Sequence, residues 1–217
     1  MPKALIWFLM LFGFFFLFVG IFVKFFFVVG LIMLGVGAYF GVGPDSVLRK
    51  DQVIDSWAAL IENGQTKSDA VLCDTEAFMT NSKVPDIVME RKEISPTVIS
   101  GFIGKKRDFL TITGQGNFRL NPYKIYINTR DYGDNLDVSW HLTYKPSILQ
   151  SIASLLPFIN IIPLRLNDLD LFDQQDLRAY ATNVHHCFLK AVEKLLLTLN
   201  QDPSKLERKS RGFLGIS

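Results

Sequence analysis

The sequence predicts an α+β protein in two parts: an N-terminal two-helix transmembrane hairpin, and a soluble domain with an antiparallel sheet packed on a long C-terminal helix. Three observations predict it. An apolar run opens the chain, a pair of alternating strands stands near its centre, and an amphipathic stripe follows toward its end. Strands that precede a helix as a group are typical of the α+β class.

The first 44 residues differ in composition from the rest of the chain. They hold only two of the 44 charged residues, Lys3 and Lys24, but 11 of the 19 Phe. As one helix the apolar run would reach about 60 Å, twice the roughly 30 Å hydrocarbon core of a bilayer. We therefore expect two transmembrane helices, Ala4–Ile21 and Phe26–Val42. A re-entrant hairpin and a single crossing with an apolar extension are the alternatives.

Basic residues around this run predict its orientation. Lys3 precedes the first expected span, and Arg49-Lys50 follow the second, so both termini should be cytoplasmic. The expectation is a multi-pass integral protein of the cell (inner) membrane. Residues 45–200 would form its cytoplasmic domain, and residues 201–217 a basic flexible tail.

Glycines in the second expected span share one helix face. Gly30, Gly37 and Gly41 are seven and four residues apart, and the last two form a small-x-x-x-small pair. Two interpretations follow. The face mediates self-association or contact with a partner subunit, or it packs against the first helix, where Gly13 and Gly20 also share a face.

Hydrophobic spacing predicts the elements of the domain. Residues 47–63 show a largely helical spacing that ends at Asn63-Gly64, and a short helix is expected at Asp74–Thr80. Short strands are expected at Ile87–Ile94, Thr97–Ile103 and Asp108–Thr113.

A β-hairpin is predicted next, with its turn at Asp131–Asp134. If Arg130 pairs with Asn135, then Ile127 faces Val138 and both sheet faces are consistent. The polar face is the candidate ligand or partner site, and its members are Lys124, Tyr126, Asn128, Asp137, Ser139 and His141. The alternative is a solvated face, which antiparallel sheets commonly have.

A long amphipathic helix is predicted at Gln174–Leu199, with Asp173 as N-cap and with Asn200 and Pro203 beyond its end. An uncharged segment, Ser147–Leu164, precedes it. The candidate membrane or lid residues of this segment are Ile148, Leu149, Ile152, Leu155, Leu156 and Phe158. The segment could be core, lie in the membrane interface, or cover an apolar cavity.

Other motifs fit ordinary structural roles. Adjacent residues on a helix point about 100° apart, so His185-His186-Cys187 cannot easily chelate one ion. The acidic stretch Asn167–Asp176 lacks the Gly and Glu of a calcium loop, and Gly114-Gln115-Gly116 lacks the Lys of a phosphate loop. No metal or cofactor is predicted. Lys105–Arg107 and the basic tail could contact anionic headgroups, or be solvated.

The net charge limits which classes of partner the chain is expected to bind. Lys3 and Lys24 account for the net charge of +2, and a domain that is neutral overall argues against nucleic-acid binding. The sheet-then-helix order resembles that of helix-grip lipid-binding domains, a resemblance of element order that carries no residues across.

The sequence is compatible with three functions. The first is a membrane-anchored, non-enzymatic module whose cytoplasmic domain binds a protein partner or organises a membrane complex. The alternative is binding of a lipid or other apolar ligand in a sheet–helix cavity gated by Ser147–Leu164. The third is an enzyme that uses His141, Tyr126 and Asp137 on the hairpin.

Overall fold

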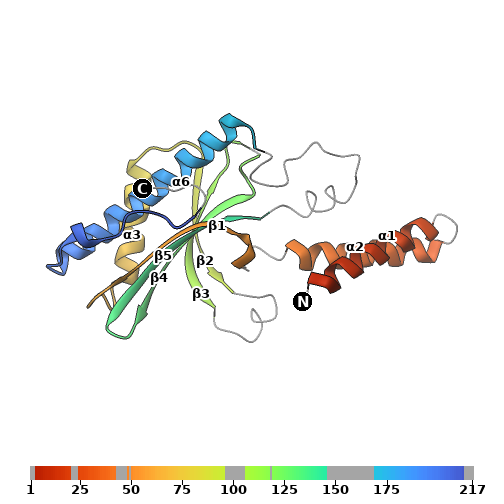
Figure 1. The fold of residues 1–217 in the computed structure, drawn as a ribbon, viewed down its shortest axis with the longest axis horizontal. Coiled ribbons are helices and arrows are strands. Elements are labelled where there is room, and N and C mark those ends of the chain that lie inside the picture. The colour runs from red at the N-terminus through yellow and green to blue at the C-terminus, as the bar shows by residue number, and fades with distance from the viewer. Residues whose placement is uncertain are drawn as a thin grey trace.

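The computed structural model describes residues 3–20, 24–42, 48, 50–95, 106–117, 119–145 and 169–212. Along the chain the elements are α1 (Lys3–Gly20), α2 (Lys24–Val42), η1 (Lys50–Gln52), β1 (Val53–Ile61), α3 (Ser68–Asn81), β2 (Ile87–Ile94), β3 (Arg107–Gly114), β4 (Tyr123–Tyr132), β5 (Asn135–Tyr144), α6 (Leu171–Thr198) and η3 (Pro203–Lys205). Figure 1 shows their arrangement.

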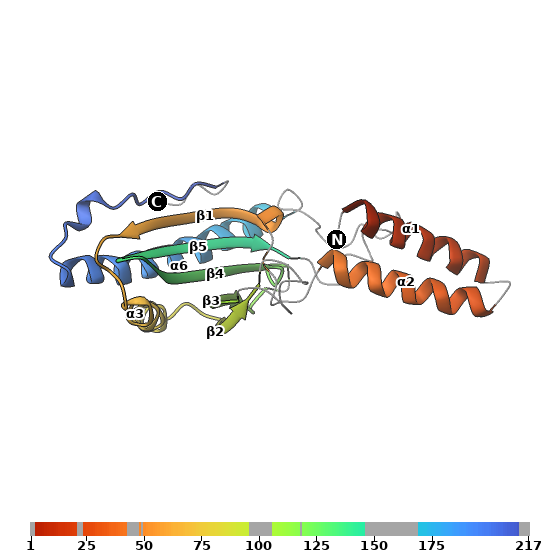
Figure 2. The same cartoon turned by 90° about the horizontal axis from the view of Figure 1, so that it is seen from below.

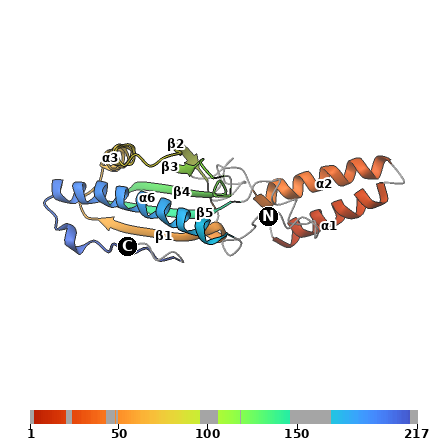
Figure 3. The ribbon, with the colours of Figure 1, turned by 90° about the horizontal axis from the view of Figure 1, so that it is seen from above.

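The five strands form one antiparallel sheet in the order β1-β5-β4-β3-β2. Helix α6 lies across one face of the sheet, behind the strands in Figure 2 and in front of them in Figure 3. Helix α3 packs beside α6. The predicted antiparallel sheet and long C-terminal helix are therefore confirmed.

The core fills the space between the sheet and the two helices. Strand residues such as Ile125, Ile127 and Trp140 meet Leu177 and Phe188 of α6, and all five are at most 1% exposed. Their positions follow the two periodicities of the chain, because alternate strand residues share a sheet face and every third or fourth helix residue shares a stripe. This part of the sheet–helix interface is solid.

Helix α6 begins three residues earlier than its apolar spacing predicts. Its N-cap is Asp170, whose carboxylate accepts a hydrogen bond from the backbone N–H of Asp173 at 2.9 Å. Asp173, the predicted N-cap, instead lies in the first turn. At the other end Asn200 has a positive φ of 56°, and the N–H of Gln201 bonds back to the carbonyl of Leu196, which ends the helix as expected.

The predicted helix at residues 47–63 is wrong, because residues 53–61 form strand β1. Trp57 and Ile61 point into the core, whereas Leu60 is exposed. The same apolar residues fit a helical period, so local spacing did not separate the two possibilities. Pairing with β5 decided the outcome, because the strand gains a ladder of backbone hydrogen bonds and places Trp57 over Phe188.

The hairpin forms with a different register from the predicted one. Tyr132 pairs with Asn135 across a two-residue turn, so Ile127 faces Trp140 rather than Val138. Gly133 in this turn has a φ of +62°, which glycine adopts without strain. The slip is two residues, so every side chain keeps its predicted sheet face.

The predicted transmembrane spans are contradicted. None of the helices built from the described residues has both the length and the apolar character that crossing a bilayer requires. The apolar run is divided into helices of 18 and 19 residues. The expected multi-pass, integral placement in the cell (inner) membrane, with a cytoplasmic domain, depended on those spans and is withdrawn with them.

Helices α1 and α2 nevertheless pack closely along their glycines. A Cβ at Gly30 would lie 2.8 Å from the Gly13 carbonyl oxygen, and a Cβ at Gly37 would lie 3.0 Å from Met10. These two glycines therefore face α1, as the second interpretation of the glycine face held. Gly41 lies in α2, and its surroundings are outside the described part of the chain.

Candidate functional site

The polar hairpin face lies on the side of the sheet away from α6. Tyr126 pairs with His141 and Asn128 with Ser139 across β4 and β5, so the structure brings these four predicted residues together. Tyr126, Asn128 and Ser139 are buried, with 2%, 4% and 8% of their surfaces exposed. The solvated-face interpretation therefore fails for these three.

The remaining polar-face residues belong to neighbouring pairs. Lys124 faces Thr143, and Asp137 faces Arg130, whose Nε lies 2.7 Å from the Asp137 carboxylate. Burial lowers the pKa of His141, and the charge of Asp137 opposes this shift only in part. His141 is therefore biased toward its neutral form, and Asp137 has Arg130 as a direct partner. Proton exchange between His141 and Asp137 stays a prediction.

The predicted lid or membrane residues, Ile148, Leu149, Ile152, Leu155, Leu156 and Phe158, lie outside the described residues, as does the predicted strand Thr97–Ile103.

A cavity of about 740 Å³ lies beside the solid core, where the start of β2 and the end of β3 approach α6. Three parts of the chain that are far apart in the sequence line it: residues 84–87, residues 114, 116, 117, 120 and 123, and residues 176, 179, 180 and 183. Its apolar and aromatic lining is Val84, Pro85, Ile87, Leu120, Tyr123, Ala179 and Tyr180, and its polar lining is Asp86, Asn117, Asp176 and Asn183. The predicted site residues on the hairpin face are not among them.

Several polar groups of this lining are already bonded within the protein. The Tyr180 hydroxyl donates to the carbonyl of Ile112 at 2.7 Å, and burial raises its pKa. Asn117 donates from Nδ2 to Asp173 at 2.7 Å and accepts from the N–H of Arg119 at 3.0 Å. These groups therefore serve to hold the wall in shape.

An ion-pair cluster supports the wall at the start of α6. Arg119 lies 2.9 Å from the carboxylate of Asp173 and 3.0 Å from that of Asp170. Burial raises the pKa of Asp173, but the hydrogen bonds from Arg119 and Asn117 outweigh burial, so its pKa lies below the ordinary value. The acidic stretch thus caps the helix and ties it to the β3–β4 connection.

A hydrogen bond fixes the backbone of Asp86. Asp86 has a φ of +57°, and its carbonyl accepts a hydrogen bond from the N–H of Gln115 at 2.7 Å. A Cβ at Gly116 would lie 2.6 Å from an Asp86 carboxylate oxygen, so glycine is what allows the carboxylate to sit there. Gly114-Gln115-Gly116 therefore shapes the cavity.

The His185-His186-Cys187 motif is split by the helix. His185 is fully buried and accepts a hydrogen bond at Nδ1 from Trp140 Nε1 at 2.8 Å, whereas His186 is exposed. Cys187 is buried, with its sulfur 3.7 Å from Asn183 Oδ1, and burial raises its pKa. The described residues contain no group of three or more His, Cys, Asp or Glu that could hold a metal ion.

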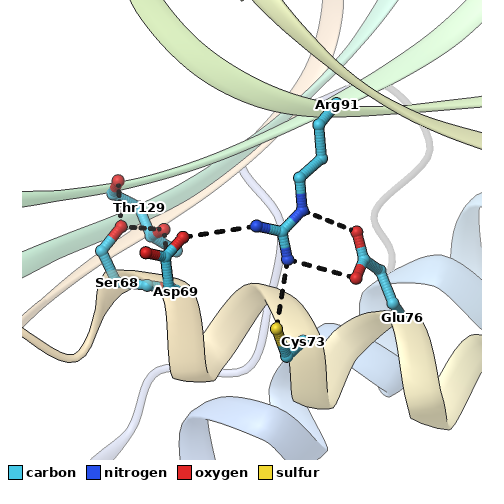
Figure 4. A network of polar contacts seen from close by, with 6 residues as sticks. All are labelled: Ser68, Asp69, Cys73, Glu76, Arg91 and Thr129. Atoms are coloured by element: carbon cyan, nitrogen blue, oxygen red, sulfur yellow. Dashed lines mark hydrogen bonds and ion pairs between the residues drawn. The ribbon is translucent and has the colours of Figure 1, made fainter.

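A second polar cluster joins β2 to α3 (Figure 4). Arg91 forms a two-pronged contact with Glu76, at 2.9 and 3.1 Å, and reaches Asp69 and Cys73 at 3.3 Å each. Asp69, Cys73 and Glu76 lie four and three residues apart on one face of α3. The cluster is largely exposed, so its evident role is to clamp α3 onto the sheet.

The segment after α6 returns along the edge strand β1, as Figures 2 and 3 show. The N–H of Arg211 bonds to the carbonyl of Ser56 at 2.8 Å, and Trp57 Nε1 donates to the carbonyl of Glu207 at 2.6 Å. Residues 207–211 thus contact the sheet edge. The proposed boundaries of the three parts of the chain stay predictions.

The sequence did not point to the cavity, because its walls come from three distant parts of the chain. A signal for His185 did exist, since it falls four residues after Ala181 within the apolar stripe and a buried Trp needs an acceptor. No known protein family, curated protein or solved structure shows a significant match to this chain.

Proposed function

We propose that this protein is a binding module that takes a ligand with an apolar body into the cavity between α6 and the β2–β3 side of the sheet. The single observation that carries the proposal is the cavity itself. Its volume of about 740 Å³ falls within the roughly 300–1,000 Å³ of small-molecule sites. No catalytic step is needed to account for its lining.

The composition of the walls supports an apolar body. Tyr180 presents an aromatic ring, and Val84, Ile87 and Leu120 add aliphatic surface. A ligand that covered these side chains would remove apolar area from water, which contributes roughly 25 cal/mol for each Å² buried. The Tyr180 hydroxyl and the Asn117 amide are held by hydrogen bonds within the protein, so these side chains stay in the wall and do not fill the cavity.

Photo-crosslinking of the full chain tests this proposal. An uncharged alkyl diazirine should label peptides from residues 84–87, 114–123 and 176–183, and excess unlabelled alkane alcohol should suppress this labelling. Mass spectrometry separates these peptides from those of α1 and α2, whose exposed apolar residues also attract the probe.

A cavity-filling variant provides the control. Val84→Trp, at a partly buried residue of the cavity wall, should fill part of the cavity and abolish labelling of its peptides, whereas Ala77→Phe, at an exposed position on α3, should not. Equal labelling in both variants would show that the cavity is not the binding site.

The surface of the α1–α2 hairpin favours a second function, contact with another protein. Trp7, Leu11 and Phe15 recur at four-residue steps on α1 and are 59%, 67% and 59% exposed. Exposed apolar surface of this kind marks interaction sites. The occupant we propose is a second copy of this chain, because the charged residues of these helices, Lys3 and Lys24, lie at their starts and leave two such faces free of like-charge repulsion.

Sedimentation of the full chain tests self-association. The double change Trp7→Ser and Leu11→Ser should shift the protein from dimer to monomer, whereas Leu60→Ser, at an exposed apolar residue of β1, should leave the dimer intact. A monomeric parent chain that floats with lipid vesicles through the same face would refute the self-association proposal in favour of lipid contact.

A further inference from the structure

The cavity carries charge of one sign. Asp86 lines it from the turn between α3 and β2, and Asp176 lines it from the second turn of α6; both residues are exposed to solvent. None of the described residues that line the cavity is basic. Neither aspartate forms an ion pair with another residue in the described part of the chain.

Their neighbours, by contrast, are satisfied. Asp170 and Asp173, six and three residues before Asp176, share Arg119, and Asn117 is bonded on both sides of its amide. Arg119 is therefore paired with the carboxylates at the start of α6 and does not line the cavity. Two carboxylates remain as the charged groups that an occupant would meet.

We propose that the ligand is an organic cation, an amine with an apolar body, whose ammonium group is bound by Asp86 and Asp176. This inference rests on the proposed binding function and adds the chemical class of its ligand. A charge-assisted hydrogen bond from an ammonium N–H to a carboxylate is stronger than a neutral one. The partly exposed ring of Tyr180 adds an aromatic face, which attracts a cation.

The lining also distinguishes an amine from a bare metal ion. Ca²⁺ takes about six to eight oxygen ligands and Mg²⁺ six. Here the Asn117 amide oxygen and the Tyr180 hydroxyl are engaged in bonds within the protein, and most of the wall is apolar. Two carboxylates in a largely apolar wall suit an ammonium group attached to a hydrocarbon better than a hard cation.

The geometry of Asp86 prepares this site before any ligand binds. The hydrogen bond from Gln115 to the Asp86 carbonyl fixes the backbone, and the absent side chain of Gly116 leaves room for the carboxylate. A binding group that is already in place loses little conformational entropy on binding. The Asp86 backbone is therefore fixed at the cavity wall, and Asp176 lines the cavity from the helix.

Displacement of the diazirine probe from the cavity peptides tests the inference with three competitors of equal chain length: octylamine, octanol and octanoate. Octylamine should displace the probe at a concentration about tenfold below that of octanol, which is the difference expected of one charge-assisted contact. Octanoate should be the weakest competitor. The advantage of octylamine should shrink as salt is raised.

The double change Asp86→Asn and Asp176→Asn should reduce the advantage of octylamine over octanol to less than about twofold while octanol still competes. Asp134→Asn, an exposed carboxylate in the β4–β5 turn, should leave the advantage unchanged. Competition by octanol and octanoate equal to that by octylamine would overturn the amine inference and leave the binding function intact. Absence of cavity labelling in the parent chain would overturn both.

Discussion

His185 of α6 is the acceptor for Trp140 of β5, with 2.8 Å between Nδ1 of the imidazole and Nε1 of the indole. The opposite ring nitrogen, Nε2, lies 2.7 Å from the backbone carbonyl oxygen of Arg208. An indole N–H can only donate and a carbonyl can only accept, so the ring is neutral and carries its proton on Nε2. One side chain thus joins sheet, helix and C-terminal segment.

This arrangement predicts that acid destabilises the protein. Burial lowers the pKa of His185, more than the Arg208 carbonyl and Asp55 raise it. Its folded pKa is therefore below the unfolded value of about 6.5. The stability it supplies is complete above pH about 6.5 and is lost as pH falls from there toward the folded pKa, because the unfolded chain then binds the proton more readily.

Urea unfolding at several pH values measures this effect. His185→Gln should cost about 1–3 kcal/mol at neutral pH and flatten the decline in unfolding free energy below pH about 6.5. Some decline should remain, because burial lowers the pKa of His141 as well. His186→Gln, at the exposed neighbour, should flatten the decline only slightly, because the charge of His186 lowers the pKa of His185 less than burial does, and an unchanged slope in His185→Gln would contradict the assignment.

The close approach of the C-terminal segment to Asp55 predicts a sensitive glycine. A Cβ at Gly212 would collide with the Asp55 backbone and carboxylate, next to the bond from Ser210 to Asp55 at 3.1 Å. Gly212→Ala should loosen this segment and make trypsin cleave after Arg208, Lys209 and Arg211 several-fold faster. Gly114→Ala, where a Cβ has no neighbour within 4 Å, should cleave at the parent rate.

The packing of α6 predicts a large penalty at Phe188. Its ring is fully buried and stands edge-on to Trp57, with 5.8 Å between the ring centroids. Phe188→Ala should lower the unfolding free energy by about 3–5 kcal/mol, since a cavity replaces the ring. Leu197→Ala, at a side chain that is 65% exposed, should change it by less than about 0.5 kcal/mol. Similar losses in both variants would refute the placement of α6.

The Arg91 clamp predicts a smaller, salt-dependent effect. A Lys at this position cannot make the two-pronged contact with Glu76, so Arg91→Lys should cost on the order of 0.5 kcal/mol in low salt, given that Arg91 is partly exposed. The loss should shrink in 1 M salt, because the Debye length there is only about 3 Å. Arg107→Lys, at an exposed residue of β3, is the matched control and should show no loss.

Hydrophobic spacing was enough to predict which faces of several elements are buried. Alternation along residues 123–144 assigned each side chain to one side of the sheet, and three- and four-residue steps from Leu177 onward assigned the stripe of α6. These assignments held because burial follows the period of the backbone and needs no knowledge of the partner. The strand Ile87–Ile94 was also found at its predicted bounds.

Only the tertiary structure decided what depends on contacts between distant residues. A two-residue slip of the hairpin preserves every face, so alternation could not select the pairing of Tyr132 with Asn135. The apolar spacing of residues 53–61 fits both a helix and a strand, and pairing with β5 selects the strand. Asp86 and Asp176 line one cavity only after the chain folds. Local patterns report burial, whereas register, strand choice and sites arise from pairings that the free energy of the whole fold selects.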